Sequence, residues 1–270
     1  MYVNALALAV LLLAAPSTAD EPLRYRFEKG LVYDDTTVRT FYFEFTRTGD
    51  EKDRKTGKEA KPQVWDISSK EILRRTVLKT DKTAHPMIER VEVIQFDRIV
   101  KESPDPNERK GISQDPSVGR VFIWRRMKTA WKLFDGKDQD VTERFGKLVN
   151  RLKNWRDARL SRKPVAVGEK WDVSMETFLR TSGSPPPEGI TGMAVFKLDS
   201  LERGLASISF TAHGSDTAQG ARRSYRMSGK WRFDASRGRD LELKSEGTFK
   251  VEGEKGGKGT MTYHRTVSYR

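Results

Sequence analysis

Three closely spaced aspartates are the first residues whose types and spacing suggest chemistry. Asp135, Asp138 and Asp140 are separated by three and two residues, and carboxylates at such intervals can surround a calcium ion. The segment lacks the residue order of an EF-hand loop, however, and no glutamate stands at the twelfth position. Asp135 precedes a glycine, and Asp140 stands where a following helix needs an N-cap. We therefore predict a turn and a cap here, and no metal site.

The histidines and the absence of cysteine limit the chemistry further. No two of His85, His213 and His264 have a zinc-binding spacing such as His-x-x-x-His. We expect His213 to lie with Asp216 at a polar hairpin end, and His264 to face solvent. The absence of cysteine excludes thiolate nucleophiles, cysteine-based zinc sites and iron–sulfur clusters.

Sequence motifs of common enzyme classes are also missing. The chain has no Gly-x-Ser-x-Gly elbow, no phosphate-binding P-loop and no Gly-x-Gly-x-x-Gly dinucleotide fingerprint. Paired carboxylates that meet only in space, as in glycoside hydrolases, leave an unrecognised hydrolase as a less favoured alternative. We predict no cofactor and assign no catalytic residue.

A cluster of basic residues suggests an anionic partner. Residues 222–239 hold seven Arg and Lys side chains, and Arg226, Lys230 and Arg232 share one face of a predicted strand. The aromatic residues have the opposite parity, whereas nucleic-acid platforms expose aromatics among their cations, so we expect no nucleic-acid partner. With a net charge of +13, this face suits an anionic polymer or lipid head groups. It also fits an ordinary solvated sheet face.

One segment has helical periodicity. Phe145, Leu148, Leu152 and Trp155 recur at intervals that place them on one face of an α-helix. The spacing predicts an amphipathic helix over about 140–160, which begins at Asp140 and ends before Pro164.

Most of the remaining chain alternates apolar and polar residues, which is typical of strands with one buried face. We predict about a dozen antiparallel strands, several longer than the usual five or six residues. The fold class is mainly β, with a large curved sheet, an open or half barrel, wrapped around the helix. A closed barrel of about eight to ten strands with an external helix is the alternative. The predicted strands cover 23–28, a strand ending at 41–45, 63–67, 71–80, 87–99, 119–126, 129–134, 169–177, 190–201, 205–213, 223–233, 241–251 and 261–269.

The first residues predict export. An apolar run at 5–15 is too short for a stable membrane span and precedes small residues that end at Ala19. We interpret 1–19 as a cleaved signal peptide and 20–270 as a single β-rich domain. No later stretch is apolar enough to span a membrane, so we expect a soluble periplasmic or extracellular protein.

Two segments resemble known sequences. The stretch 163–172, KPVAVGEKWD, and the stretch 25–33, YRFEKGLVY, resemble segments of uncharacterised exported bacterial β-rich proteins. The second stretch is similar to their first hairpin. The order of strands and helix is also similar to the lipoprotein-carrier class, an open barrel that shelters acyl chains. This resemblance implies an open β-architecture and assigns no functional residue.

The leading hypothesis is a non-enzymatic protein that binds an apolar or amphiphilic ligand, such as a lipid. The ligand would lie between the sheet and the helix face that carries Phe145, Leu148, Leu152 and Trp155. The alternative for that space is a solidly packed core. The alternative function is a module that binds an anionic polymer or lipid head groups through Arg226, Lys230 and Arg232.

Overall fold

The computed structural model describes residues 22–45, 62–104, 109–127, 130–152, 159–181, 186–218, 220–252 and 256–270. These residues form one antiparallel sheet of 12 strands and two short helices. The elements are β1 (Val32–Phe45), β2 (Gln63–Thr80), β3 (Pro86–Glu102), β4 (Gly111–Gln114), β5 (Val121–Arg126), β6 (Trp131–Phe134), α2 (Gly146–Leu152), β7 (Lys170–Ser174), α3 (Met175–Thr181), β8 (Thr191–Glu202), β9 (Leu205–Ala218), β10 (Ala221–Asp234), β11 (Arg239–Glu252) and β12 (Gly257–Tyr269).

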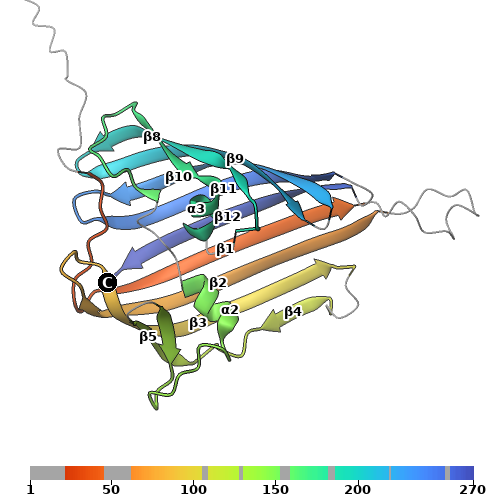
Figure 1. Ribbon diagram of the computed structural model, residues 1–270. Coiled ribbons are helices and arrows are strands. Elements are labelled where there is room, and N and C mark those ends of the chain that lie inside the picture. The colour runs from red at the N-terminus through yellow and green to blue at the C-terminus, as the bar shows by residue number, and fades with distance from the viewer. Residues whose placement is uncertain are drawn as a thin grey trace, which may run out of the picture.

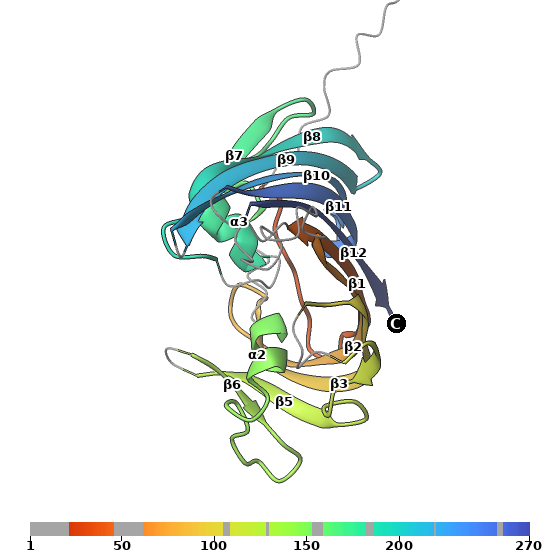
Figure 2. The same cartoon turned by 90° about the vertical axis from the view of Figure 1, so that its right-hand side faces the viewer.

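The strand order shows an open sheet. It runs β6-β5-β3-β2-β1-β12-β11-β10-β9-β8-β7, with β4 paired to β3, so β6 and β7 are edges (Figure 1). Figure 2 shows the sheet curving around α2 and α3, which lie on its concave side. The predicted fold class is confirmed, and the closed-barrel alternative is wrong.

Each long strand has one face toward the helices and one toward solvent. We call the concave side, with α2 and α3, the inner face, and the convex side the outer face. β1 pairs with β12 and β2 without a register shift, so its odd-numbered side chains from Tyr33 to Phe45 all point inward. The alternation read from the sequence therefore corresponds to these two faces.

Two hydrophobic cores form on the inner face. The larger core joins α3 to strands β7–β12 and to the residues before β1. The smaller core packs α2 against β2, β3, β5 and β6. Among the described residues, no helix combines the length and the apolar character that crossing a membrane requires.

The helix predicted over 140–160 begins later than expected. Residues 142–145 form turns, and α2 starts at Gly146. Asp140 does not cap α2: its carboxylate accepts the Thr142 N–H at 3.0 Å and contacts Lys132 Nζ at 2.8 Å. The predicted start was wrong because this capping pattern also stabilises an isolated turn. Residues 153–158 lie outside the described residues.

The strand predicted over 169–177 ends at Ser174, where α3 begins. The Ser174 hydroxyl accepts the Thr177 N–H at 3.2 Å, as an N-cap does. Met175 and Phe178 then enter the larger core from this single short helix. A helix of seven residues shows too few turns for its period to be distinguished from alternation.

Residues 22–31 form a segment that we call the strap. Its odd residues Leu23, Tyr25 and Phe27 are buried as alternation predicted, but residues 22–29 pair with no described strand, and only Gly30 and Leu31 form backbone hydrogen bonds with β2, at Val77. Instead the Arg26 N–H donates to the Gly238 carbonyl, and the Phe27 N–H to the Ala84 carbonyl. The strap thus connects the β10–β11 and β2–β3 turns across one end of the inner face. The predicted strand and first hairpin were wrong, because alternation reports one-sided burial and not strand pairing.

Candidate functional site: the inner face of the sheet

The predicted helix-face residues lie in the smaller core. Phe145, Leu148 and Leu152 are 7%, 1% and 3% exposed, and the Phe145 ring meets Phe122 edge-on at 4.9 Å. Trp155 lies outside the described residues. At the three described positions the helix face is therefore packed against the sheet.

The predicted basic residues lie together on the outer face. Arg226, Lys230 and Arg232 are exposed on β10, while Trp231 and Phe233 of the same strand are fully buried on the inner face. The sequence therefore placed the cations and the aromatics on the correct sides. Arg226, Lys230 and Arg232 make no ion pair with any described residue, and Lys230 lies opposite a further lysine, Lys244.

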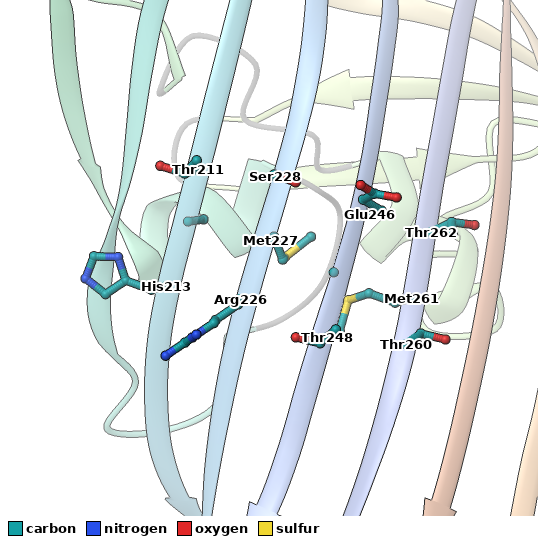
Figure 3. A pocket seen from close by; sticks show the side chains of 12 residues that line it. Thr211, His213, Arg226, Met227, Ser228, Glu246, Thr248, Thr260, Met261 and Thr262 are labelled. Atoms are coloured by element: carbon teal, nitrogen blue, oxygen red, sulfur yellow. The ribbon is translucent and has the colours of Figure 1, made fainter.

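Two shallow grooves on the outer face meet at Arg226. The first, of about 530 Å³, runs across β9–β12 from His213 to Thr262 (Figure 3). The second, of about 1150 Å³, extends toward Tyr42 on β1. Carboxylates such as Glu246 line them beside the cations. Both grooves therefore carry mixed charge.

Five aromatic rings gather at one end of the inner face and belong to neither core. We call them the aromatic patch. The centroids of neighbouring rings lie 4.9 to 6.4 Å apart, and the rings of Phe41 and Phe43 each stack on that of Phe249. The members are Phe41, Phe43, Phe45, Trp65 and Phe249. Figure 1 shows the β1 arrowhead, where Phe45 lies, well beyond α2 and α3.

The patch is only partly shielded from solvent. Phe43 and Phe249 are 7% and 9% exposed, whereas Phe41, Phe45 and Trp65 are half-buried. Apolar rings that stay accessible beside two sealed cores are a candidate ligand surface.

Two glycines of β12 seat these rings. A Cβ at Gly257 would come within 2.6 Å of Phe43 Cζ, and one at Gly259 within 2.5 Å of Phe249 Cε1. Real Cβ atoms do not approach so closely, so the rings can lie flat on the sheet only because these positions are glycine. Rings covering inward glycines are a device of curved sheets.

A row of hydrogen-bond donors lies next to the patch. Arg39 on β1 faces Tyr263 on β12 and Ser69 on β2, and Tyr263 faces Ser245 on β11. Residues directly opposite in adjacent strands point to the same face, so all four lie inward. We call these four the donor row. Each is half-buried, and no member hydrogen-bonds to a described residue through its side chain. Arg39 lies over the Tyr263 ring, with its guanidinium carbon 5.5 Å from the centroid.

On the side of the donor row that is nearer the strap, buried charged side chains of the inner face form an ion-pair network. Arg265, 2% exposed, donates to Asp35 at 2.7 and 2.9 Å and to Asp240 at 2.7 Å. Although burial opposes the charge, Asp35 and Asp240 raise the pKa of Arg265 well above its ordinary value. Asp240 also accepts from the Tyr25 hydroxyl and the Trp231 indole N–H. The network ties the strap to the middle of the sheet.

Sequence reasoning identified neither the network nor the donor row. Their members come from separate strands, and Asp35 and Arg265 are 230 residues apart. The one available signal was parity, because Arg265 and Arg39 have the parity of their strands' apolar residues. Such charged residues at inward positions are informative once the register is known.

The aspartates that suggested calcium bind groups of this chain. Asp135 accepts the backbone N–H groups of Lys137 and Gln139, both at 2.9 Å, and Asp138 pairs with Arg125 at 3.1 Å. Among the described residues, no cluster of three or more potential metal ligands occurs.

The histidine expectations had mixed outcomes. His213 and Asp216 lie within β9 and not at a hairpin end, so that prediction was wrong. Their odd and even positions put them on opposite faces, and Asp216 is buried against Arg223 at 2.6 Å. His264 lies on the outer face, as expected, with Nε2 3.0 Å from Glu242.

Neither a protein-family model nor a curated protein matches the chain. Among solved structures it is similar to Salmonella typhi OmpF in complex with daunomycin, at 6% identity and a TM-score of 0.24, covering 88% of this chain and 97% of that chain. It is also similar to Pseudomonas aeruginosa OccK11 (OpdR), at 9% identity and a TM-score of 0.20, covering 88% of this chain and 66% of that chain. Likenesses this weak carry no argument about fold or function.

Proposed function

We propose that this protein is an exported, non-enzymatic binding protein for an apolar or amphiphilic ligand, which it holds on the inner face of the sheet. The aromatic patch is the binding surface, and the proposed export rests on the apolar run at 5–15 and the small residues up to Ala19.

One observation carries the proposal: in a group of five contacting rings, Phe41, Phe45 and Trp65 stay half-buried on a face where both cores are sealed. A solvated sheet has no need of adjacent rings on its accessible inner side, because isolated exposed apolar residues are the norm. From Phe41 to Phe45 the patch extends about 13 Å along β1, at about 3.3 Å per residue. Each methylene that a ligand buries there stabilises the complex by about 0.8 kcal/mol.

The test is binding of a fluorescent fatty-acid probe to the purified protein. Phe45→Ser should weaken binding at least tenfold, because it removes a half-buried ring at the open end of the patch. Ile112→Ser is the matched control: Ile112 is 75% exposed on β4, outside the patch. Equal binding by both variants, or no uptake by the native protein together with no co-purifying lipid in organic extracts, would overturn the proposal.

A second candidate function is contact with an anionic polymer through the outer face. The observation that favours it is that Arg226, Lys230 and Arg232 lack carboxylate partners among the described residues, although other outer-face cations have them, as in the Lys244–Glu242 pair.

Binding of a polyanion such as heparin should then fall steeply with salt. The double variant Arg226→Glu, Arg232→Glu should abolish it. Lys79→Glu, an exposed cation near the β2–β3 turn, should leave it in place. If the double variant binds as the native protein does, the outer face is a solvated surface only.

A further inference from the structure

The cation of the donor row differs from the other buried or half-buried arginines of the inner face. Arg265 is paired with Asp35 and Asp240, and Arg75 with Glu89. Arg39 has no carboxylate partner among the described residues, and its guanidinium lies over the Tyr263 ring. A half-buried guanidinium without an anion is an incomplete arrangement, since such charges are normally paired.

The residues directly opposite Arg39 add donors and no negative charge. Tyr263 and Ser69 flank it on the adjacent strands, and Ser245 lies beyond Tyr263. Their three hydroxyls make no hydrogen bond to a described residue. Adjacent strands lie about 4.8 Å apart, so the row is about 14 Å long from Ser69 to Ser245. A carboxylate or phosphate beside Arg39 can accept from its guanidinium and from the hydroxyl of an adjacent strand, that of Tyr263 or Ser69.

The inward carboxylate nearest to Arg39 in the strand pairing forms no ion pair with it. Glu71 lies opposite Thr37, one pair further toward the strap, and is 6% exposed. Arg39 is half-buried, so a ligand that approaches over the aromatic patch meets the cation first.

The inward side chains change from polar to apolar one residue pair beyond the donor row, toward the end of β1 at Phe45. The next inward row contains Gly247, Met261, Phe41 and Ile67, and the row after it contains Phe249, Gly259, Phe43 and Trp65. From Arg39 to Phe45 this lane is about 20 Å long, at about 3.3 Å per residue. Its two ends thus differ in chemistry as the two ends of an amphiphile do.

We infer that the ligand is an anionic single-chain amphiphile, whose carboxylate or phosphate head group is held by Arg39 together with the adjacent hydroxyl of Tyr263 or Ser69, and whose chain lies on the aromatic patch. Ser245 lies at the far end of the donor row, one strand beyond Tyr263. This inference rests on the proposed function and specifies its ligand class.

The experiment compares amphiphiles that share one chain. Binding of laurate, dodecyl phosphate and dodecyl maltoside is measured by displacement of a neutral fluorescent alkyl probe, below their micelle concentrations. The native protein should prefer the two anions over the maltoside at least tenfold. A preference for only one anion identifies that head group.

Variants then locate the preference. Arg39→Gln should remove the preference for anions while the neutral amphiphile still binds, and Arg39→Lys should restore part of it. Lys70→Gln is the matched control, because Lys70 is an exposed cation on β2, next to Ser69 but on the outer face. It removes the same charge and should change nothing.

The outcomes separate the two proposals. If no amphiphile binds, the proposed function itself fails. If all three bind equally well, or if Arg39→Gln keeps the preference while its circular dichroism and melting match those of the native protein, the head-group inference is overturned and the apolar site stands.

Discussion

The two ends of β1 share one alternation but have different surroundings. Near the strap, the inward residues Tyr33, Asp35 and Thr37 are all buried, and the Tyr33 hydroxyl donates to Glu89 at 2.7 Å. Beyond Arg39, the inward rings of Phe41 and Phe45 remain half-buried. We call the first the sealed end and the second the open end.

The difference shows that one sheet face can serve two purposes along its length. At the sealed end the strap, the larger core and paired charges bury the inward side chains of β1, which stabilises the fold. At the open end the same strands present rings and donors that no described element completes. The following changes should therefore affect stability at the sealed end and binding at the open end.

The largest effect is expected from Asp240→Asn in the charge network. It leaves Arg265 with less compensating charge in a buried position, and breaking a buried ion pair costs about 3–5 kcal/mol. Urea unfolding would measure the loss. Asp199→Asn, which removes a partly exposed carboxylate, serves as the control. A loss no greater than that of the control would show that the sealed end does not depend on its charges.

The second change tests the smaller core. Leu148→Ala removes a side chain that is 1% exposed on α2, and such cavities cost about 2–5 kcal/mol. Urea unfolding should show this loss, and amphiphile binding by the remaining folded protein should be unchanged. Weaker binding by the variant at an equal folded fraction would show that the ligand binds against α2 and not on the aromatic patch.

The third change tests the strap. Gly238 has a φ of +64°, and a Cβ there would lie 2.5 Å from the Arg24 carbonyl oxygen. Gly238→Ala should cost about 1–3 kcal/mol through strain and strap displacement. Gly119→Ala, with a φ of +77° and open space around the new Cβ, measures strain alone. Equal shifts in melting temperature would mean that the strap does not hold the sealed end.

The fourth change tests the open end. Phe45→Ala should lower stability by only about 1 kcal/mol, because the ring is half-buried and the strand continues to pair. Phe233→Ala, a ring at 0% exposure in the larger core, should cost about 3–5 kcal/mol. Chemical denaturation of both variants measures the contrast, and equal losses would remove the distinction between the two ends.

The smallest effect is expected for a pair on the outer face. A hydrogen bond from Arg74, at 2.9 Å, lowers the pKa of Asp34 below its ordinary value of 3.8. Because the folded-state pKa is lowered, this stabilisation is present above pH 3.8 and is lost as the pH falls through the folded-state value.

Asp34→Asn should therefore flatten the acid limb of the stability profile by at most about 1 kcal/mol, since the pair is solvent-screened. Melting temperatures measured across acidic pH would test this. An unchanged acid limb would show that other carboxylates account for it.

The sequence predicted the sheet well because its signal is local. Lys230 and Trp231 alternate in chain order, so their opposite faces could be read directly. The strap was misjudged because the burial of Tyr25 depends on turns far along the chain. The start of α2 was misjudged because the Asp140 cap serves a turn before the helix.

The candidate site was harder to predict because it depends on register. The sequence places Phe41, Phe43 and Phe45 near the end of one strand. Phe249 lies beside them because β12 pairs with both β1 and β11, and the sequence alone does not show this order of strands. In the same way, Arg39 can be assigned to a candidate site only once Tyr263 and Ser69 are known to lie opposite it, and each of these positions follows from a separate strand pairing.

The pairing of β1 with β12 also has a kinetic consequence. The centre of the sheet joins the first described strand to the last, with Tyr33 opposite Tyr269. A pairing between strands so far apart in sequence raises the contact order, which slows folding. Until β12 is added, β1 has an unpaired edge, so the two halves of the sheet are expected to form first and to join last at the strands that carry Arg39 and Tyr263.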